Sequence, residues 1–172
     1  MDASSIVLVS SGAVVALVAL SAFFSSSETA IFTLSEAWLD AEARTGDDRA
    51  TLLVELREDP HRLLVTILVG NNIVNVAISS IMTAVLIIHL PTGWAVTAAT
   101  LLASSIVLVF GEIVPKSYGL GNAPRWAMTV ARPIAIVERG LYPLVVVFDA
   151  ITRRMTVALG GDQEIEQPYI DT

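Results

Sequence analysis

The chain has 172 residues, of which 54% are hydrophobic and 16% charged, and its mean hydropathy is +0.69. This composition is too apolar for a soluble domain of this length and indicates a membrane protein. The formal net charge of −7 disfavours nucleic acid as a partner, because no basic surface is available to neutralise phosphates. The absence of cysteine excludes disulfides, thiol catalysis and cysteine-ligated zinc sites.

Three apolar segments are long enough to span a bilayer, which takes about 20 residues. These spans are predicted over residues 3–27, 63–88 and 94–111, and no charged residue lies between Arg62 and Glu112. A further segment over residues 132–155 carries Glu138 and Arg139 near its middle. Central charges cost about 2.5–3.5 kcal/mol each on insertion. This segment is therefore predicted to lie in the interface, within a belt of helices over residues 124–158. A fourth span is the alternative.

The basic residues predict the orientation of the chain. All ten lie either between the first and second spans or after the third. The positive-inside rule therefore places the N-terminus outside and the C-terminus in the cytoplasm. Residues 36–59, between the first two spans, are predicted to form a helical hairpin with a break at residues 45–48, capped by Asp47 or Asp48. Asp59 before Pro60 is predicted to cap the second span.

The predicted fold is thus an all-α membrane protein with three transmembrane helices, a cytoplasmic helical hairpin and a juxtamembrane belt of interfacial helices. The transmembrane domain is predicted over residues 1–160. The remaining residues, 161–172, form an acidic tail.

Polar side chains interrupt the first two predicted spans near their cytoplasmic ends. Ser21 and Ser25 are four residues apart and share one face of the first helix. Asn71 and Asn75 share a face of the second, and Asn72 lies about 100° round that helix. Interhelical packing is the alternative role for the serines. Three amides so close together in a span are harder to explain by packing.

The third span ends with Gly111 and Glu112, followed by Pro115. Proline has no N–H to donate to the carbonyl four residues earlier, which belongs to Gly111. A free backbone oxygen is therefore expected beside the Glu112 carboxylate. Such groups are tolerated at membrane depth where they line a cavity or hold an ion. The alternative is that Glu112 marks the interfacial end of the helix.

Taken together, these groups form a set of oxygen ligands that suits a hard cation such as Mg²⁺, Ca²⁺ or Na⁺ and is poor for zinc or copper. The candidate metal ligands are Ser21, Ser25, Asn71, Asn72, Asn75, Gly111 and Glu112.

Three stretches carry a resemblance to a known family: the serines of the first span followed by ETA, LLVTILVGNNIVN in the second, and FGEIVPK in the third. They resemble the membrane domain shared by the CorB/CorC magnesium transporters and the animal cyclin M proteins. The resemblance covers nearly the whole chain and includes Gly70, Pro115 and Lys116. Asn72 matches the prokaryotic members better than the animal ones.

This resemblance implies a homodimer in the plasma membrane, with Mg²⁺ held between the serines, the asparagines and the glutamate. Family members usually continue into a cytosolic CBS-pair module that binds ATP. That module is absent from this sequence, so the acidic tail is expected to be truncated before it.

The expected function is magnesium transport rather than enzymatic catalysis. Moving a divalent ion outward against 100 mV costs about 4.6 kcal/mol, twice the figure of about 2.3 per charge, so efflux would need a coupled ion such as Na⁺. A magnesium-responsive scaffold or sensor that binds but does not conduct the ion is the alternative. An intramembrane serine hydrolase is disfavoured, because the spans contain no histidine and no GxSxG motif.

Overall fold

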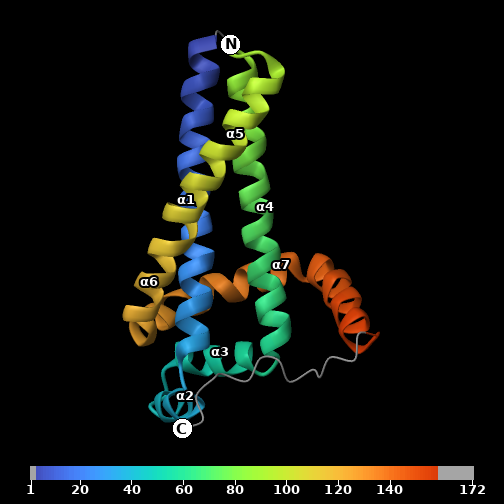
Figure 1. Cartoon of the computed structure of the whole chain (residues 1–172). Helices are drawn as coiled ribbons and strands as arrows, with labels where there is room; N and C mark the ends of the chain where they lie inside the picture. The colour runs from blue at the N-terminus through green and yellow to red at the C-terminus, as the bar shows by residue number, and fades with distance from the viewer. Residues whose placement is uncertain (1–2, 159–172) are drawn as a thin grey trace. The chain divides into compact units, whose positions relative to one another are not determined.

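The computed structural model describes residues 3–158, which form helices and no strands (Figure 1). The long helices α1 (Ala3–Thr33) and α4 (Pro60–Ile87) are separated by the short helices α2 (Glu36–Ala43) and α3 (Asp48–Arg57). The rest of the described chain consists of α5 (Thr92–Ile106), the π-helical segment η1 (Val107–Ile113), α6 (Val114–Gly121) and α7 (Ala123–Ala158). The predicted all-helical class is confirmed, whereas the predicted acidic tail lies outside the described residues.

Three stretches of helix in the described chain are long and apolar enough to cross a membrane: Ser4–Thr33, Pro60–Ile87 and Thr92–Gly121. The third combines α5, η1 and α6. The prediction of three spans is therefore confirmed. The orientation of the chain in the membrane stays a prediction. The helical run of the third span continues beyond Gly111, where the sequence had placed the end of that span.

The chain divides into two compact units, which are described separately. The first unit comprises Met1–Ser26 and Asn71–Tyr118, and the second comprises Ser27–Gly70 and Gly119–Thr172. All seven candidate metal ligands belong to the first unit.

In the first unit, α1, α4 and α5 run side by side (Figure 1). The buried face of α5 is a row of alanines, Ala95, Ala99 and Ala103, spaced four residues apart. Alanines at this spacing allow helix backbones to approach closely, which is how spanning helices pack where lipid supplies no hydrophobic drive. On α4, Val74 and Ile78 are also buried and lie four residues apart.

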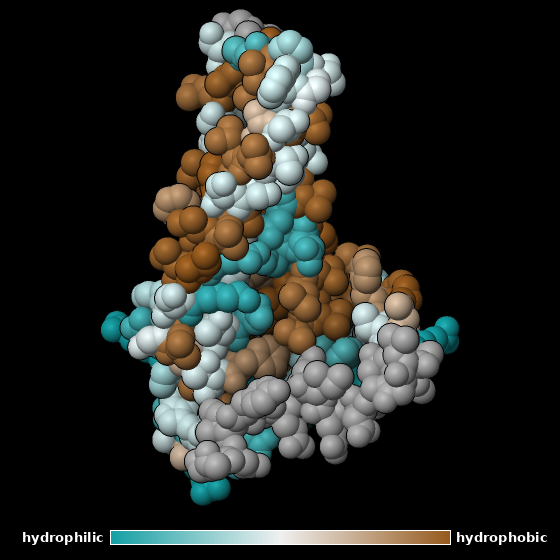
Figure 2. All heavy atoms as spheres, viewed as in Figure 1, coloured by the Kyte–Doolittle hydropathy of each residue, from teal (hydrophilic) through white to brown (hydrophobic). Residues whose placement is uncertain are grey.

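Many of the atoms along the long helices are hydrophobic on the face seen in Figure 2, where they are brown. Leu8, Val15, Val76 and Leu101 each expose 65% of their surface or more. A monomeric soluble protein rarely exposes such a large apolar surface. Hydrocarbon in place of water around these helices explains it.

The second unit contains the predicted helical hairpin. Ser35 caps α2 by accepting a hydrogen bond from the Trp38 backbone N–H at 3.3 Å. Asp47 caps α3 by accepting one from the Arg49 N–H at 2.8 Å. Gly46 between the two helices has a φ of +84°, a left-handed conformation that glycine adopts without steric cost. Helix α3 then packs against α7 through buried apolar residues, Leu53 among them.

The start of α4 follows the predicted cap. The Asp59 side chain accepts a hydrogen bond from the Arg62 N–H at 3.0 Å, and Pro60 is the first residue of the helix. Proline is favourable there because the first helical N–H has no partner within the helix. The predicted cap of the second span is therefore confirmed.

Helix α7 has 36 residues and carries Pro133 and Pro143 within it. The sequence suggested several belt helices over residues 124–158, and the structure has this one helix instead. Each proline removes one backbone hydrogen bond and bends a helix without having to end it. The ribbon of α7 accordingly bends between its orange and red parts (Figure 1).

Two ion pairs join α7 to the first turn of α4 and its cap. The Arg62 guanidinium pairs with the Glu138 carboxylate, whose side chain is only 12% exposed. Arg153 pairs with Asp59 at 3.2 Å. The belt helix is thus attached to the base of the second span at two points.

Candidate cation site

Ser21 is the residue around which the first unit's polar groups gather. It lies on α1 and is completely buried. Its hydroxyl oxygen is 2.9 Å from the Asn71 Oδ1 and also 2.9 Å from the Asn75 Oδ1. Both asparagines reach it because residues four apart lie on one face of α4. The predicted shared face of Asn71 and Asn75 is confirmed, and the structure adds their contact with the first span.

These three oxygens share too few protons. A serine hydroxyl carries one hydrogen and an amide oxygen carries none. The Ser21 hydroxyl therefore has one proton for two amide oxygens, which it shares between Asn71 and Asn75 or gives to one of them at a time. The cluster thus has fewer protons than close oxygen pairs. Such a cluster has surplus lone pairs, which attract a cation and repel an anion.

Gly111 brings the third helix to the same serine. It is buried in η1, and a β-carbon at this position would lie 2.7 Å from the Ser21 Oγ and 3.3 Å from the Ser21 Cβ. Real β-carbons do not approach other heavy atoms as closely as the first of these distances. Glycine is therefore required for the contact. The sequence predicted a ligand role for Gly111 through its carbonyl oxygen but missed this steric role.

The π-helical segment η1 resolves the conflict that Pro115 creates. In a regular α-helix the proline ring would clash with the carbonyl of Gly111, four residues earlier. In η1 a backbone N–H bonds to the carbonyl five residues earlier instead of four, which makes the helix wider. The Val114 N–H, for example, donates to the Val109 carbonyl. The helix therefore passes Pro115 and continues as α6. Single π-helical turns of this kind are frequent at functional sites.

Ser25 and Glu112 flank the cluster along their helices. Ser25 is completely buried one turn beyond Ser21 on the same face of α1. Glu112 follows Gly111 in η1 and is partly buried. Within residues 3–158 its carboxylate has no hydrogen-bond or ion-pair partner. A carboxylate in this setting is electrostatically suited to a cation, because its charge is not neutralised by the described chain.

Asn72 is placed differently from the other two asparagines. It is exposed on α4, whereas Asn71 and Asn75 are partly buried. The contacts at Ser21 involve Asn71, Asn75 and Gly111. Asn72 lies at the edge of that group.

The available donors fit a hard cation. Residues 3–158 contain no group of three or more His, Cys, Asp or Glu side chains that could hold a metal ion. Hydroxyl and amide oxygens with one nearby carboxylate suit Mg²⁺, Ca²⁺ or Na⁺, whereas soft metals need thiolate or imidazole ligands. The donors around Ser21 are therefore of the kind that hard cations prefer.

Comparison with known proteins identifies the family. The model of the cyclin M transmembrane N-terminal domain, CNNM, matches residues 12–172. A DUF21 domain-containing protein of Arabidopsis thaliana, described as chloroplastic, is 36% identical over 155 residues, which are 90% of this chain and 23% of the relative. The UPF0053 inner membrane protein YfjD of Escherichia coli is 33% identical over 146 residues, 85% of this chain and 34% of the relative.

A UPF0053 protein of Haemophilus influenzae is 31% identical over 153 residues, 89% of this chain and 36% of the relative. The chain spans between 19% and 38% of the length of the curated relatives that it matches. The domain match and these identities agree with the resemblance found in the three spans. The chain belongs to the CNNM family, and it is a multi-pass membrane protein.

Proposed function

We propose that this domain moves Mg²⁺ across the membrane and that the ion binds among Ser21, Ser25, the three asparagines, the Gly111 carbonyl and Glu112. The single observation that carries the proposal is the proton-poor oxygen cluster at Ser21, with its two oxygen–oxygen distances of 2.9 Å. The resemblance to the CorB/CorC magnesium transporters supports movement of the ion as well as its binding.

The spacing of the oxygens is compatible with Mg²⁺. Magnesium takes six oxygens in an octahedron at about 2.0–2.1 Å, so neighbouring ligand oxygens stand about 2.9 Å apart. Calcium binds oxygens at about 2.3–2.6 Å, which spreads the ligands to roughly 3.3 Å or more in the same geometry. The 2.9 Å separations at Ser21 are ordinary hydrogen-bond lengths, and they coincide with the ligand spacing around Mg²⁺.

Ligands from three helices suit a transport step. Ser21 belongs to α1, the asparagines to α4 and Gly111 to η1, so a change in the packing of any one helix alters the ligand set. Efflux of Mg²⁺ against an inside-negative potential would need a driving ion, and we propose Na⁺ in that role. Uptake would not need one.

The setting of the domain is part of the same proposal. The family resemblance supports a homodimer in the plasma membrane, with a CBS-pair module following in the longer proteins of the family. Relatives are described as an inner membrane protein in Escherichia coli and as chloroplastic in Arabidopsis thaliana, so the host membrane differs between members.

Flux and binding must be measured together, because a magnesium sensor would bind the ion without moving it. The chain is reconstituted in liposomes that contain a Mg²⁺-sensitive dye, with and without a Na⁺ gradient. We expect Mg²⁺ flux that depends on the Na⁺ gradient and that falls strongly in Asn75→Ala. The matched control is Ser11→Ala, an exposed serine of α1 in the same unit, which should transport like the wild type. Binding without flux would favour the sensor instead.

A further inference from the structure

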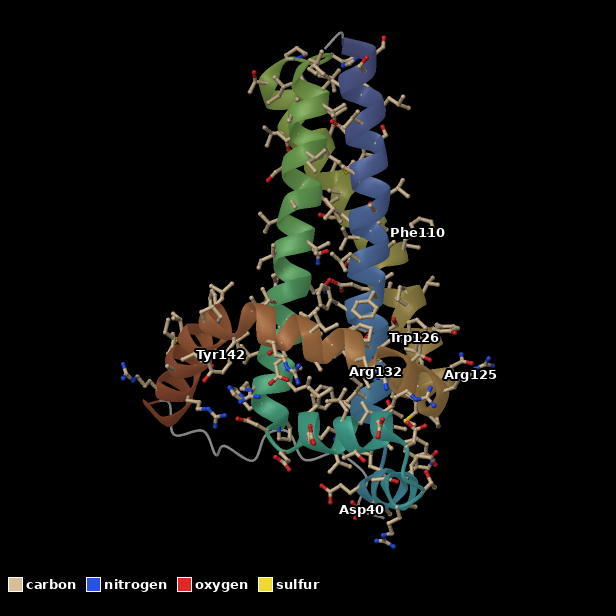
Figure 3. The ribbon with its side chains drawn as sticks, turned by 180° about the vertical axis from the view of Figure 1, so that it is seen from behind. Asp40, Phe110, Arg125, Trp126, Arg132 and Tyr142 are labelled. Carbon is tan, nitrogen blue, oxygen red and sulfur yellow. The ribbon has the colours of Figure 1, made fainter. Side chains whose placement is uncertain are left out.

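A cavity of about 490 Å³ lies in the second unit where α3, the first turn of α4 and the middle of α7 meet. This volume is in the range of small-molecule and headgroup sites, about 300–1,000 Å³. Tyr142 forms part of the wall on α7, beside the lower end of α4 (Figure 3), and the Arg62 guanidinium lies 6.0 Å from its ring centroid. The charged residues of the wall are Glu55, Glu58, Arg62, Glu138 and Arg139.

These charges divide into a paired and an unpaired set. Arg62 and Glu138 neutralise each other across the cavity wall. The side chains of Glu55, Glu58 and Arg139 form no hydrogen bond or ion pair within residues 3–158. The cavity therefore offers two free carboxylates, one on α3 and one on the residue that follows it, and one free guanidinium on α7. A complementary ligand carries a positive group and a negative group.

The cavity lies at the depth of lipid headgroups. Helix α4 has 28 residues and is about 42 Å long at about 1.5 Å per residue. The hydrocarbon core of a bilayer is about 30 Å thick, so a centred helix of this length extends about one turn beyond it at each end. Arg62 is in the first turn of α4 and thus reaches the headgroup region.

The neighbouring part of α7 can meet the acyl chains. Val147, Phe148 and Ile151 follow Tyr142 on α7, and each exposes 45% or more of its surface. An amphipathic helix with large exposed apolar residues lies in the membrane interface with that face in the lipid. A headgroup in the cavity would therefore have apolar surface beside it.

We propose that this cavity binds the headgroup of an aminophospholipid, with the phosphate at Arg139 and the ammonium at Glu55 and Glu58. A primary ammonium has three N–H donors for two carboxylates, and a guanidinium matches a phosphate with paired donors. A choline headgroup lacks the N–H donors. A glycerol headgroup lacks the positive charge. Its phosphate would lie near the two carboxylates without a cation to neutralise them. The proposal does not depend on which ion the domain transports.

Native mass spectrometry of the purified chain in detergent tests this selectivity. Phosphatidylethanolamine, phosphatidylcholine and phosphatidylglycerol with identical acyl chains are added in equal amounts. We expect the ethanolamine lipid to be retained about tenfold more than either of the others, as one or two charge-assisted hydrogen bonds would give. In the double variant Glu55→Gln/Glu58→Gln, the preference over phosphatidylcholine should disappear. In Arg139→Gln, retention of the ethanolamine lipid should fall.

Matched controls separate this site from general attraction between charges and lipid. Arg154→Gln removes an exposed arginine of α7 outside the cavity, and Glu36→Gln removes an exposed carboxylate of α2. Both should retain the ethanolamine lipid like the wild type. Soluble phosphoethanolamine distinguishes a lipid from a free metabolite, and we expect it to compete only weakly. Equal retention of the three lipids would overturn the proposal. So would equal effects of Arg154→Gln and Arg139→Gln, or tight binding of soluble phosphoethanolamine.

Discussion

Gly111 lies against Ser21 with no room for a side chain between them, because a β-carbon at Gly111 would stand 2.7 Å from the Ser21 hydroxyl oxygen. The same hydroxyl contacts Asn71 and Asn75. Ser21 is therefore the point at which all three spans meet. Substitutions at either end of this contact should act on the whole oxygen cluster.

Gly111→Ala should disrupt the site more than its size suggests. The added methyl group meets Ser21, so the third helix must shift or the serine must rotate away from the asparagines. We expect Mg²⁺ binding to weaken at least tenfold, and overpacking of a close helix contact costs about 1–3 kcal/mol of stability. Thermal unfolding in detergent and calorimetric titration measure the two effects.

Gly12→Ala is the control for that experiment. Gly12 lies on α1 in the same unit, and nothing lies within 4 Å of a β-carbon built there. Replacing an unconstrained helical glycine by alanine stabilises a helix by about 0.5–1 kcal/mol. Unchanged Mg²⁺ affinity and stability in Gly111→Ala would show that the three-helix contact does not shape the site.

The shared proton of Ser21 predicts non-additive substitutions. Because one hydroxyl serves two amide oxygens, Asn71→Ala and Asn75→Ala each leave it a partner, while Ser21→Ala removes both contacts at once. We expect Ser21→Ala to cost roughly 0.6–1.7 kcal/mol, the range of hydrogen bonds between membrane helices. In double-mutant cycles the two asparagine variants should have little further effect on stability once Ser21→Ala is present. Fully additive stabilities would contradict the shared hydrogen bond.

The Arg62–Glu138 pair, which joins α7 to α4, should matter more than the Arg132–Asp48 pair, which joins α7 to α3. The Glu138 side chain is only 12% exposed, so Glu138→Gln leaves Arg62 without its charged partner in a partly buried place. We expect a loss of about 1–3 kcal/mol. Asp48→Asn is the control, because Asp48 and Arg132 are 4.0 Å apart and highly exposed, and such pairs contribute little. Equal melting temperatures for Glu138→Gln and the wild type would contradict this prediction.

The Asp47 cap gives the hairpin a defined response to acid. Hydrogen bonds from the Arg49 side chain and backbone lower the pKa of Asp47 from 3.8 to about 2. A lowered pKa in the folded state means that the cap is at full strength above pH 3.8 and is lost as the pH falls through about 2. An NMR titration of the Asp47 carboxyl measures this value. In Arg49→Gln it should rise toward 3.8, and an unchanged low value would show that Arg49 is not its cause.

The sequence predicted best those features that depend on residues of a single helix. Long apolar runs predicted the three spans, and Asp47 and Asp59 predicted helix starts because a capping side chain bonds only a few residues ahead. The four-residue spacing of Asn71 and Asn75 predicted their shared face. Each of these features depends on the regular geometry of one helix.

Features that depend on distant neighbours were not predictable. Glu138 was interpreted as a charge in the interface, since nothing local points to Arg62, 76 positions away in the sequence. The steric role of Gly111 depends on Ser21 of another helix. The π-helical segment was also missed. Pro115 in a long apolar run was the available signal, but a proline can end, kink or widen a helix, and the sequence does not distinguish these outcomes.

The central claim is a hard-cation site formed by three helices with Glu112 as its anionic ligand. Calorimetric titration of Mg²⁺ into the purified chain tests it most directly, with Ca²⁺ and Na⁺ as competitors and Glu112→Gln beside the wild type. Glu36→Gln, an exposed carboxylate of the second unit, is the control. We predict that Mg²⁺ binds to the wild type and to the control, and that Glu112→Gln abolishes binding. Equal binding by Glu112→Gln would contradict the account and leave Glu112 without a ligand role.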